Sequence, residues 1–241
     1  MATSMTDFAE QINPRTLAEA RRADFRQAIR VHGSFLALAE KSALVWMAER
    51  MPSWVSSDHL TLLGFAAQIA TGVCYALAAH DRRMLLVAIV CLAVNWFGDS
   101  LDGTLARVRQ QQRPRYGFYV DHISDSIGSV AMMGGLALSG FMHPVIAIGL
   151  LIAFLLLSIQ SYLATYALGE FHVSMWRFGP TELRVLLAAG NLALFRWAWV
   201  MHGRYRLFDI GGAIGLAGML MMLCVVTVKN TVRLYREEKI S

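Results

Sequence analysis

Long apolar runs separated by short polar segments dominate the chain from residue 60 onward. The hydrocarbon core of a bilayer is about 30 Å thick, and roughly 20 apolar residues of α-helix span it. Six runs are long enough, and they cover about Leu60–Ala79, Met84–Val108, Tyr116–Met142, Val145–Leu168, Thr181–Met201 and Phe208–Val228. The pattern therefore predicts an all-α polytopic membrane protein with six transmembrane helices.

The stretch before residue 55 has a different pattern, because its apolar side chains are mixed with arginine and glutamate. This mixture predicts two amphipathic helices, over about residues 16–29 and 35–51, with a break near Gly33 and a stop at Pro52. We expect them at the cytoplasmic membrane face, in contact with lipid or packed on the protein's own inner surface. The chain thus divides into an N-terminal interfacial segment, residues 1–54, and a membrane domain, residues 55–241.

The net charge of +5 comes from basic residues that gather at one set of helix ends. If the N-terminus is cytoplasmic, 17 of the 22 lysines and arginines lie inside, and the five outside are Arg82, Arg83, Arg196, Arg204 and Arg206. This distribution follows the positive-inside rule, so both termini are predicted to be cytoplasmic. It indicates a lipid bilayer as the partner rather than nucleic acid, and we expect a bacterial inner (cytoplasmic) membrane.

Four aspartates interrupt the second and third apolar runs. Asp99 and Asp102 are three residues apart and Asp121 and Asp125 are four apart, so each pair projects from one face of its helix. A carboxylate inside a membrane costs about 2.5 to 3.5 kcal/mol on insertion scales, so four of them need a compensating partner. Hard oxygen ligands select Mg²⁺ or Mn²⁺, and the two facing pairs predict an oxygen cage for divalent cations.

Both aspartate pairs are expected at the same depth in the membrane. Met84–Gly98 separates Asp99 from the outer end of its helix by fifteen residues, or roughly 22 Å. Ser126–Met142 places Asp125 seventeen residues, or about 25 Å, below the same surface. The carboxylates would then meet in the cytoplasmic third of the bilayer, within reach of both a soluble nucleotide and a lipid.

Further residues extend the aspartates to a longer motif. Gly103, Ala106, Arg107 and Gly117 stand between the two pairs. The whole string resembles the signature of the CDP-alcohol phosphotransferase (CDP-alcohol phosphatidyltransferase) family. The resemblance implies a homodimeric, metal-dependent enzyme of phospholipid biosynthesis. It would move a substituted phosphate from a CDP-linked donor, CDP-diacylglycerol or a CDP-amino-alcohol, to a lipid or small alcohol and release CMP.

The motif also implies roles for single residues. The four aspartates would hold two Mg²⁺ or Mn²⁺ ions that act on the CDP-linked donor, and resemblance to the family makes Asp125 the general base for the acceptor alcohol as well. Gly103 and Gly117 lack side chains, which lets a nucleotide approach the backbone. Arg107 follows Gly103 by four residues and can reach a phosphate as a planar fork. Together with Ala106, these residues form the predicted nucleotide and pyrophosphate site.

A second nucleotide contact is predicted just before the first run. Thr61 stands where many relatives carry the threonine of Pro-Asn-x-x-Thr, whereas Ser57 and Asp58 replace the proline and the asparagine. Asp58 is either a nucleotide contact or a helix N-cap, and we favour the cap.

Two other classes of protein place carboxylates in membranes. An intramembrane prenyltransferase is one alternative, because Asn95-x-x-x-Asp99 imitates its diphosphate-binding helix. That chemistry does not require Gly117 or the Ala106-Arg107 pair. A divalent-cation transporter is the other. Transporters tend to contain paired repeats, and we find no second copy of the motif.

The segment between the fourth and fifth runs bears on the acceptor. Members that accept phosphorylated polyols usually carry arginines at the end of the fourth helix, where this chain has alanine, threonine and tyrosine. This difference argues against a dianionic acceptor. The Gly179-Pro-Thr-Glu182 stretch resembles the branch that handles ethanolamine or choline, while Glu182-x-Arg184 also occurs in the other branch. Arg177, Glu182 and Arg184 are candidate acceptor contacts. We expect Arg184 to face the substrate and Arg177 the membrane interface, while Glu182 is equally compatible with a helix-start role.

Overall fold

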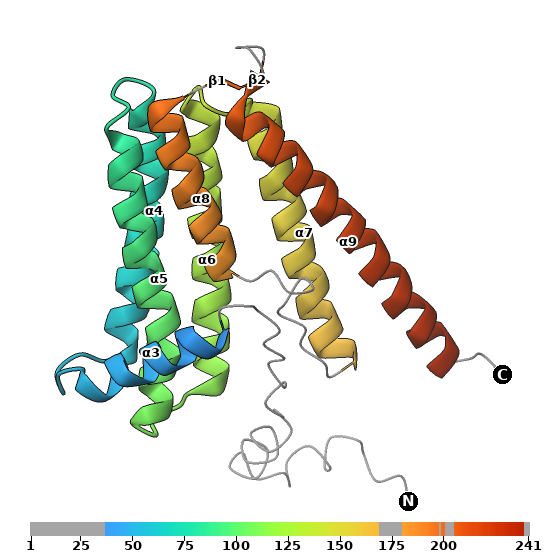
Figure 1. The fold of residues 1–241 in the computed structure, drawn as a ribbon. Coiled ribbons are helices and arrows are strands. Elements are labelled where there is room, and N and C mark those ends of the chain that lie inside the picture. Colours follow the sequence, from blue (N-terminus) through green and yellow to red (C-terminus); the bar gives the residue numbers. More distant parts are fainter. Residues whose placement is uncertain (1–36, 169–179, 198, 201–204, 239–241) are drawn as a thin grey trace, which may run out of the picture.

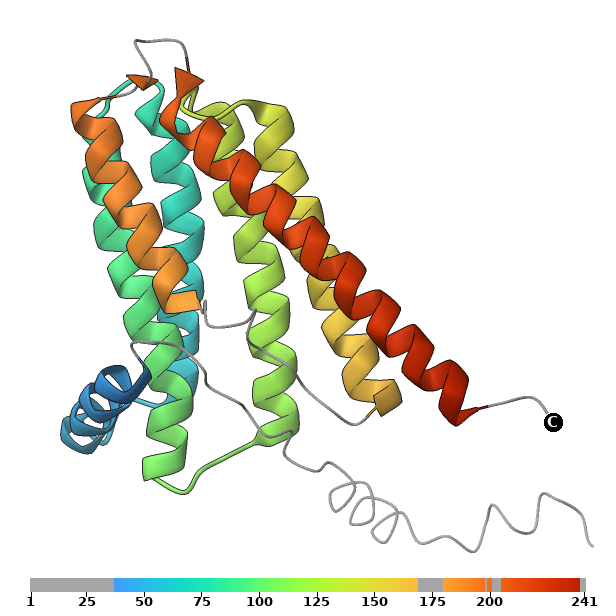
Figure 2. The same cartoon turned by 45° about the vertical axis from the view of Figure 1, so that its right-hand side comes forward.

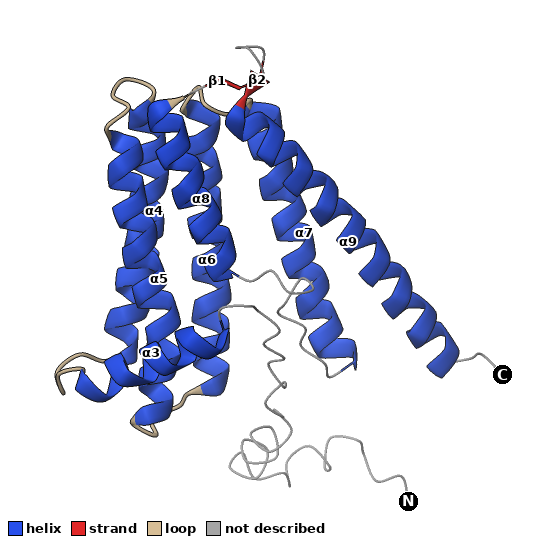
Figure 3. Ribbon diagram, viewed as in Figure 1, coloured by secondary structure: helices blue, strands red, loops and turns tan. Residues whose placement is uncertain are grey.

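The computed structural model describes residues 37–168, 180–197, 199–200 and 205–238, and this part of the chain is helical except for one pair of short strands (Figures 1 and 3). The helices are α3 (Ala37–Arg50), α4 (Ser57–Ala78), α5 (Met84–Val108), α6 (Pro114–Leu138), α7 (Pro144–Leu168), α8 (Pro180–Arg196) and α9 (Leu207–Glu237). Strand β1 (Trp199–Val200) pairs antiparallel with β2 (Tyr205–Arg206).

Helices α4 to α9 follow the six predicted apolar runs in order. Four of them, α4, α5, α7 and α9, are long and apolar enough to cross a membrane, as expected of an α-helical membrane protein. Helix α8 has 17 residues, and α6 carries Asp121 and Asp125 in its first half, so length and composition alone do not identify these two as spans. The count of six transmembrane helices therefore stays a prediction.

Three predicted helix ends are wrong, each for a local reason. Helix α6 ends at Leu138 rather than near Met142, because Gly140 turns the chain with a φ of 73°. Helix α8 ends at Arg196 rather than Met201, and β1 follows it. Helix α9 continues to Glu237, where Arg233 Nε donates a hydrogen bond of 2.9 Å to the Glu237 carboxylate four residues on.

Helix α3 lies within the second predicted amphipathic segment, while the first, residues 16–29, lies outside the described residues. Leu44 and Ala48 of α3 are buried in a small hydrophobic cluster with Leu101 and Leu105 of α5. The opposite side of the helix exposes Trp46. One side of α3 therefore packs on the protein's own surface, and contact of the other side with lipid stays a prediction.

A single hydrophobic core joins the six long helices at the end opposite to α3. We call this the outer end, marked by the α4–α5 connection (residues 79–83), and the other the inner end, marked by the α5–α6 connection (109–113). The core includes Tyr75, Leu85, Leu136, Leu194 and Phe208, which come from five helices. Toward the inner end, α7 and α9 lean away from α4, α5 and α8 (Figures 1 and 2). The helices are thus held together at one end and diverge at the other.

Helix α4 crosses α5 at very short range between Gly64 and Gly98. A methyl group added to Gly98 would lie 2.6 Å from the Gly64 nitrogen and 2.5 Å from the Leu60 carbonyl oxygen. The Asn95 amide also donates a hydrogen bond of 2.9 Å to the Gly64 carbonyl oxygen. Because Asp99 follows Gly98, this crossing places the backbone of the first aspartate close to α4.

We expect Gly98→Ala to destabilise the protein, because the added methyl meets backbone atoms that cannot rotate away. The cost should be about 1–3 kcal/mol or more, which lowers the melting temperature by about 2–4 °C for each kcal/mol in a chain of this size. Gly134→Ala is the matched control, because a methyl at Gly134 meets nothing within 4 Å. Thermal unfolding of the purified proteins measures both, and equal melting temperatures would contradict the close crossing.

Candidate active site

The four aspartates line one narrow hollow between α4, α5 and α6. Its volume is about 10 Å³, and its lining residues are Thr61, Gly64, Phe65, Gln68, Asn95, Asp99, Asp102, Asp121, Ser124 and Asp125. The two carboxylate pairs thus project from α5 and α6 toward each other, with α4 as the third wall. The structure brings together the residues that the helical spacing places on facing sides.

The first turns of α4 hold Asp102 in place. The Thr61 hydroxyl donates a hydrogen bond of 2.6 Å to Asp102 Oδ2, and the Gly103 N–H donates to Oδ1 of the same carboxylate. The Ser57 hydroxyl donates to the Asp102 carbonyl oxygen at 2.9 Å. Thr61, predicted as a nucleotide contact, therefore lies directly beside the carboxylates and fixes the orientation of one of them.

Helix α8 brings a guanidinium group to the aspartates. Arg184 donates from one terminal nitrogen to Asp99 Oδ2 at 2.6 Å and from Nε to Asn95 Oδ1 at 2.8 Å. The Arg184 side chain is only 14% exposed and that of Asp99 25%, so the ion pair is largely shielded from solvent. Of the predicted acceptor contacts, Arg184 reaches the site, Glu182 lies half-buried in the first turn of α8, and Arg177 lies outside the described residues.

The other predicted nucleotide contacts lie near the inner end of the hollow and do not line it. Arg107 is exposed in the last turn of α5, where it extends over Gly103 and donates a hydrogen bond of 2.9 Å to the Thr104 hydroxyl. Ala106 is half-buried in the same turn. Gly117 is exposed in the first turn of α6, and a methyl there would meet nothing within 4 Å. The backbone at Gly117 is therefore open to an approaching group.

The expectation that Asp58 caps α4 is wrong. The N-cap is Ser56, whose extended backbone lets its hydroxyl accept from the His59 N–H, while the His59 ring accepts from the Ser56 N–H. Asp58 lies in the first helical turn and forms an ion pair with Arg113 instead. This pair is about half exposed on both sides, and it joins the start of α4 to the start of α6.

The sequence interpretation missed Gln68, which lines the hollow. Gly128 of α6 makes room for it, because a methyl at Gly128 would overlap the Gln68 side-chain amide. A signal was present in the sequence: Gln68 follows Thr61 by seven residues, so both lie on the same face of α4, and Gln68 is an amide within an uncharged run.

Aromatic rings from α6 and α7 cluster beside the second aspartate pair. The rings of Phe118 and His122 stack with centroids 4.1 Å apart, and Tyr162 meets His122 edge to face at 5.1 Å. His122 Nδ1 lies 2.7 Å from the Phe118 carbonyl oxygen and 3.7 Å from Asp121 Oδ2. The rings therefore cover the α7 side of the carboxylates.

The chemistry of the donor set fits hard divalent cations. Among the described residues, no three His, Cys, Asp or Glu side chains are arranged around a common ion position. Four carboxylates nevertheless line one hollow, and Arg184 pairs with one of them, Asp99. Carboxylate oxygens are the ligands that Mg²⁺ and Mn²⁺ prefer.

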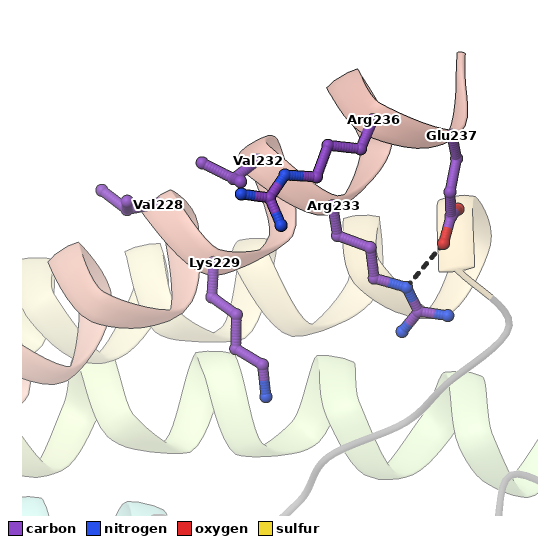
Figure 4. A pocket seen from close by; sticks show the side chains of 6 residues that line it. All are labelled: Val228, Lys229, Val232, Arg233, Arg236 and Glu237. Carbon is purple, nitrogen blue, oxygen red and sulfur yellow. Dashed lines mark hydrogen bonds and ion pairs between the residues drawn. The ribbon is translucent and has the colours of Figure 1, made fainter. Parts of the chain in front are cut away.

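A larger hollow, about 540 Å³, lies at the inner end of α9 (Figure 4). Its lining residues are Val228, Lys229, Val232, Arg233, Arg236 and Glu237, all from this one helix. Basic side chains at the end of an apolar helix are typical of a membrane boundary. The four aspartates line the smaller hollow and not this one.

Comparison with known protein families identifies a match that spans this site. The model of the CDP-alcohol phosphatidyltransferase family matches residues 54–229, well over half of the chain. The matched region contains all four aspartates, Thr61 and Arg184.

We expect Arg184→Ala to destabilise the protein most when divalent ions are withheld. The variant removes the guanidinium that pairs with Asp99, and the repulsion among the neighbouring carboxylates then rises. The melting temperature should fall by at least about 3 °C in chelator, and Mg²⁺ should narrow the difference from the unmodified protein. Arg196→Ala, at the other end of α8, is the control and should show no such dependence on ions. A loss of stability that Mg²⁺ leaves unchanged would contradict this electrostatic role.

Proposed function

The chain belongs to the CDP-alcohol phosphatidyltransferase family, and we propose that the hollow lined by Asp99, Asp102, Asp121 and Asp125 is its reaction site. The family places the chain among the membrane transferases of phospholipid synthesis, with a CDP-linked donor and an alcohol acceptor. The observation that carries the proposal is the convergence of two carboxylate pairs, from two helices, beside a guanidinium group.

The carboxylates and their neighbours would bind and orient the donor. Two Mg²⁺ or Mn²⁺ ions held by the four aspartates would neutralise the pyrophosphate of the donor and stabilise the departing CMP. Thr61 keeps Asp102 turned toward the hollow. We assign the nucleotide entrance to the inner end, around Ala106. Two observations support this assignment: the backbone at Gly117 is open, and the exposed Arg107 extends over Gly103.

Asp125 is proposed to act as the general base. Its carboxylate takes the proton of the acceptor hydroxyl while the hydroxyl oxygen forms a bond to the phosphorus atom of the donor. The bond from that phosphorus to the CMP oxygen breaks, and CMP leaves with the electron pair. The clustered rings of Phe118, His122 and Tyr162 shield the acceptor side from water.

We propose that the acceptor is an alcohol without a phosphate. We also propose that one of the two substrates is, or carries, an amino alcohol. The described end of α7 carries Thr165 and Tyr166 rather than arginines, and Arg184 is engaged with Asp99 and Asn95. Aromatic rings beside carboxylates favour a cationic amine. Two pairings satisfy this description: CDP-diacylglycerol with a small amino alcohol, and a CDP-amino-alcohol with diacylglycerol.

We further propose that the inner end faces the cytoplasm of a bacterial cell and that the enzyme is a homodimer. The basic residues at the α5–α6 connection and at the end of α9 support the orientation. A cysteine at Gln111 should then react with impermeant reagents only from the cytoplasmic side.

Helices α7 and α9 offer the most surface to a second copy of the chain. Only 11% of the apolar stretch of α7 and 6% of that of α9 is buried within the protein. Native mass spectrometry would detect a dimer directly.

Parallel assays of CMP release test the function and identify the donor. Purified enzyme is incubated with CDP-diacylglycerol plus an amino alcohol, or with a CDP-amino-alcohol plus diacylglycerol, each with Mg²⁺. We expect acceptor-dependent CMP release in one pairing, and a third reaction with CDP-diacylglycerol and glycerol phosphate should give little. Release that is fastest with the phosphorylated acceptor would contradict the proposed acceptor class, and none in any reaction would contradict the proposed function.

Replacing Asp125 should separate the base from the ligands. Asp125→Asn should lose at least about 100-fold in turnover, because the acceptor proton has no base, while it still binds the CDP-linked donor in the presence of Mg²⁺. Asp121→Asn, on the same helix face, should lose turnover and donor binding together. Equal loss of donor binding in both variants, measured by equilibrium binding of labelled donor, would make Asp125 mainly a metal ligand and would contradict its role as the base.

A further inference from the structure

One carboxylate oxygen of Glu40 on α3 accepts hydrogen bonds from two other helices. Glu40 Oε1 accepts from the Trp96 indole N–H at 2.8 Å and from the Ser100 hydroxyl at 3.4 Å, both on α5. It also accepts from the Thr181 hydroxyl of α8 at 2.8 Å. Charged acceptors form stronger hydrogen bonds than neutral ones, so this oxygen is a strong junction between three helices that are far apart in sequence.

The donors that meet at Glu40 are direct neighbours of the active-site residues. Trp96 follows Asn95, and Ser100 follows Asp99, so both sit beside the residues that hold the Arg184 guanidinium. Thr181 precedes Arg184 by three residues, within the same turn of α8. The position of the first turn of α8 is thus tied to the helix that carries the first aspartate pair.

Hydrophobic packing holds Glu40 at this junction. Glu40, Leu44 and Ala48 are four residues apart and lie on one face of α3. Leu44 and Ala48 are buried against Leu101 and Leu105 of α5. The packed face of α3 therefore directs the glutamate toward α5 and α8 rather than toward solvent.

We propose that Glu40 is a positioning residue for Arg184: it fixes the start of α8 against α5 and so keeps the guanidinium of Arg184 across Asp99. Without Glu40, the hydroxyl of Thr181 and the indole of Trp96 lose their common acceptor, and the first turn of α8 is free to move. Arg184 then spends less time beside the carboxylates. The kinetic consequence rests on the proposed function, whereas the structural consequence does not.

Distances between spin labels test the structural part without any assay of activity. Labels are attached at Lys41→Cys on α3 and Val185→Cys on α8, two exposed positions, after the three native cysteines have been replaced. We expect one narrow distance distribution in the parent protein, a clearly broader one in Glu40→Ala, and an intermediate one in Glu40→Gln, which keeps one acceptor oxygen. Glu49→Ala, on the exposed side of α3, is the control and should leave the distribution narrow.

The same variants test the consequence for the substrate. Glu40→Ala should raise the Michaelis constant for a substrate that binds beside the Arg184–Asp99 pair by about tenfold, with turnover within about threefold of the parent. We expect the same change in Arg184→Ala. Glu40→Gln should recover most of the affinity, and Glu49→Ala all of it. A merely structural role would lower the yield of folded enzyme without changing the Michaelis constant of the folded fraction.

The two readouts separate the possible failures. An unchanged distance distribution in Glu40→Ala overturns the proposal, and so does a broadened distribution in an active enzyme whose Michaelis constants are unchanged. If the parent shows no transferase activity, the proposed function fails, but the distances still decide whether Glu40 positions α8. Should Glu40→Ala not fold, Glu40→Gln decides the question by its distances, because the proposal requires a broader distribution than in the parent.

Discussion

The need to keep four carboxylates together inside a membrane constrains most of this structure. Carboxylates that share a site repel one another and lose hydration, so they are stable only if cations and hydrogen-bond donors face them. The chain supplies part of this compensation itself, through Arg184 beside Asp99 and Thr61 beside Asp102. The remainder is what the proposed divalent ions would provide.

The fold fixes the helices that carry this site at the outer end and lets others diverge at the inner end. The shared core at the outer end holds six helices together, and the crossing of Gly64 and Gly98 fixes α5 against α4 next to Asp99. At the inner end α7 and α9 diverge from the other helices (Figures 1 and 2). The nucleotide entrance proposed around Arg107 and Gly117 lies at this same end.

The helices and the aspartate pairs could be predicted from the sequence, because both depend on local spacing. Apolar runs define α4 to α9, and intervals of three and four residues place each carboxylate pair on one helix face. Helix ends were predicted less well, since the turn at Gly140 and the pairing of β1 with β2 depend on backbone geometry that apolar composition does not encode.

Contacts between distant segments could not be predicted from one sequence. Asn95 was considered as a diphosphate ligand, but its amide binds the Gly64 carbonyl and the Arg184 guanidinium, a role that requires knowing how three helices pack. Glu40 lies in a segment for which the sequence predicts only an amphipathic helix, and its partners lie 56 to 141 residues away. Asp58 and Ser56 both have side chains that can cap a helix, and only the backbone conformation decides between them.

The central claim is that the four aspartates form one metal-dependent site for phosphoryl transfer. Its most direct test is the rate of donor-dependent CMP release after all divalent ions have been removed and Mg²⁺ is then added back in steps. The account predicts no measurable release in excess chelator and a saturable recovery with Mg²⁺ or Mn²⁺, and no such recovery in Asp99→Asn, Asp102→Asn or Asp121→Asn. An unchanged rate of CMP release in excess chelator would contradict it.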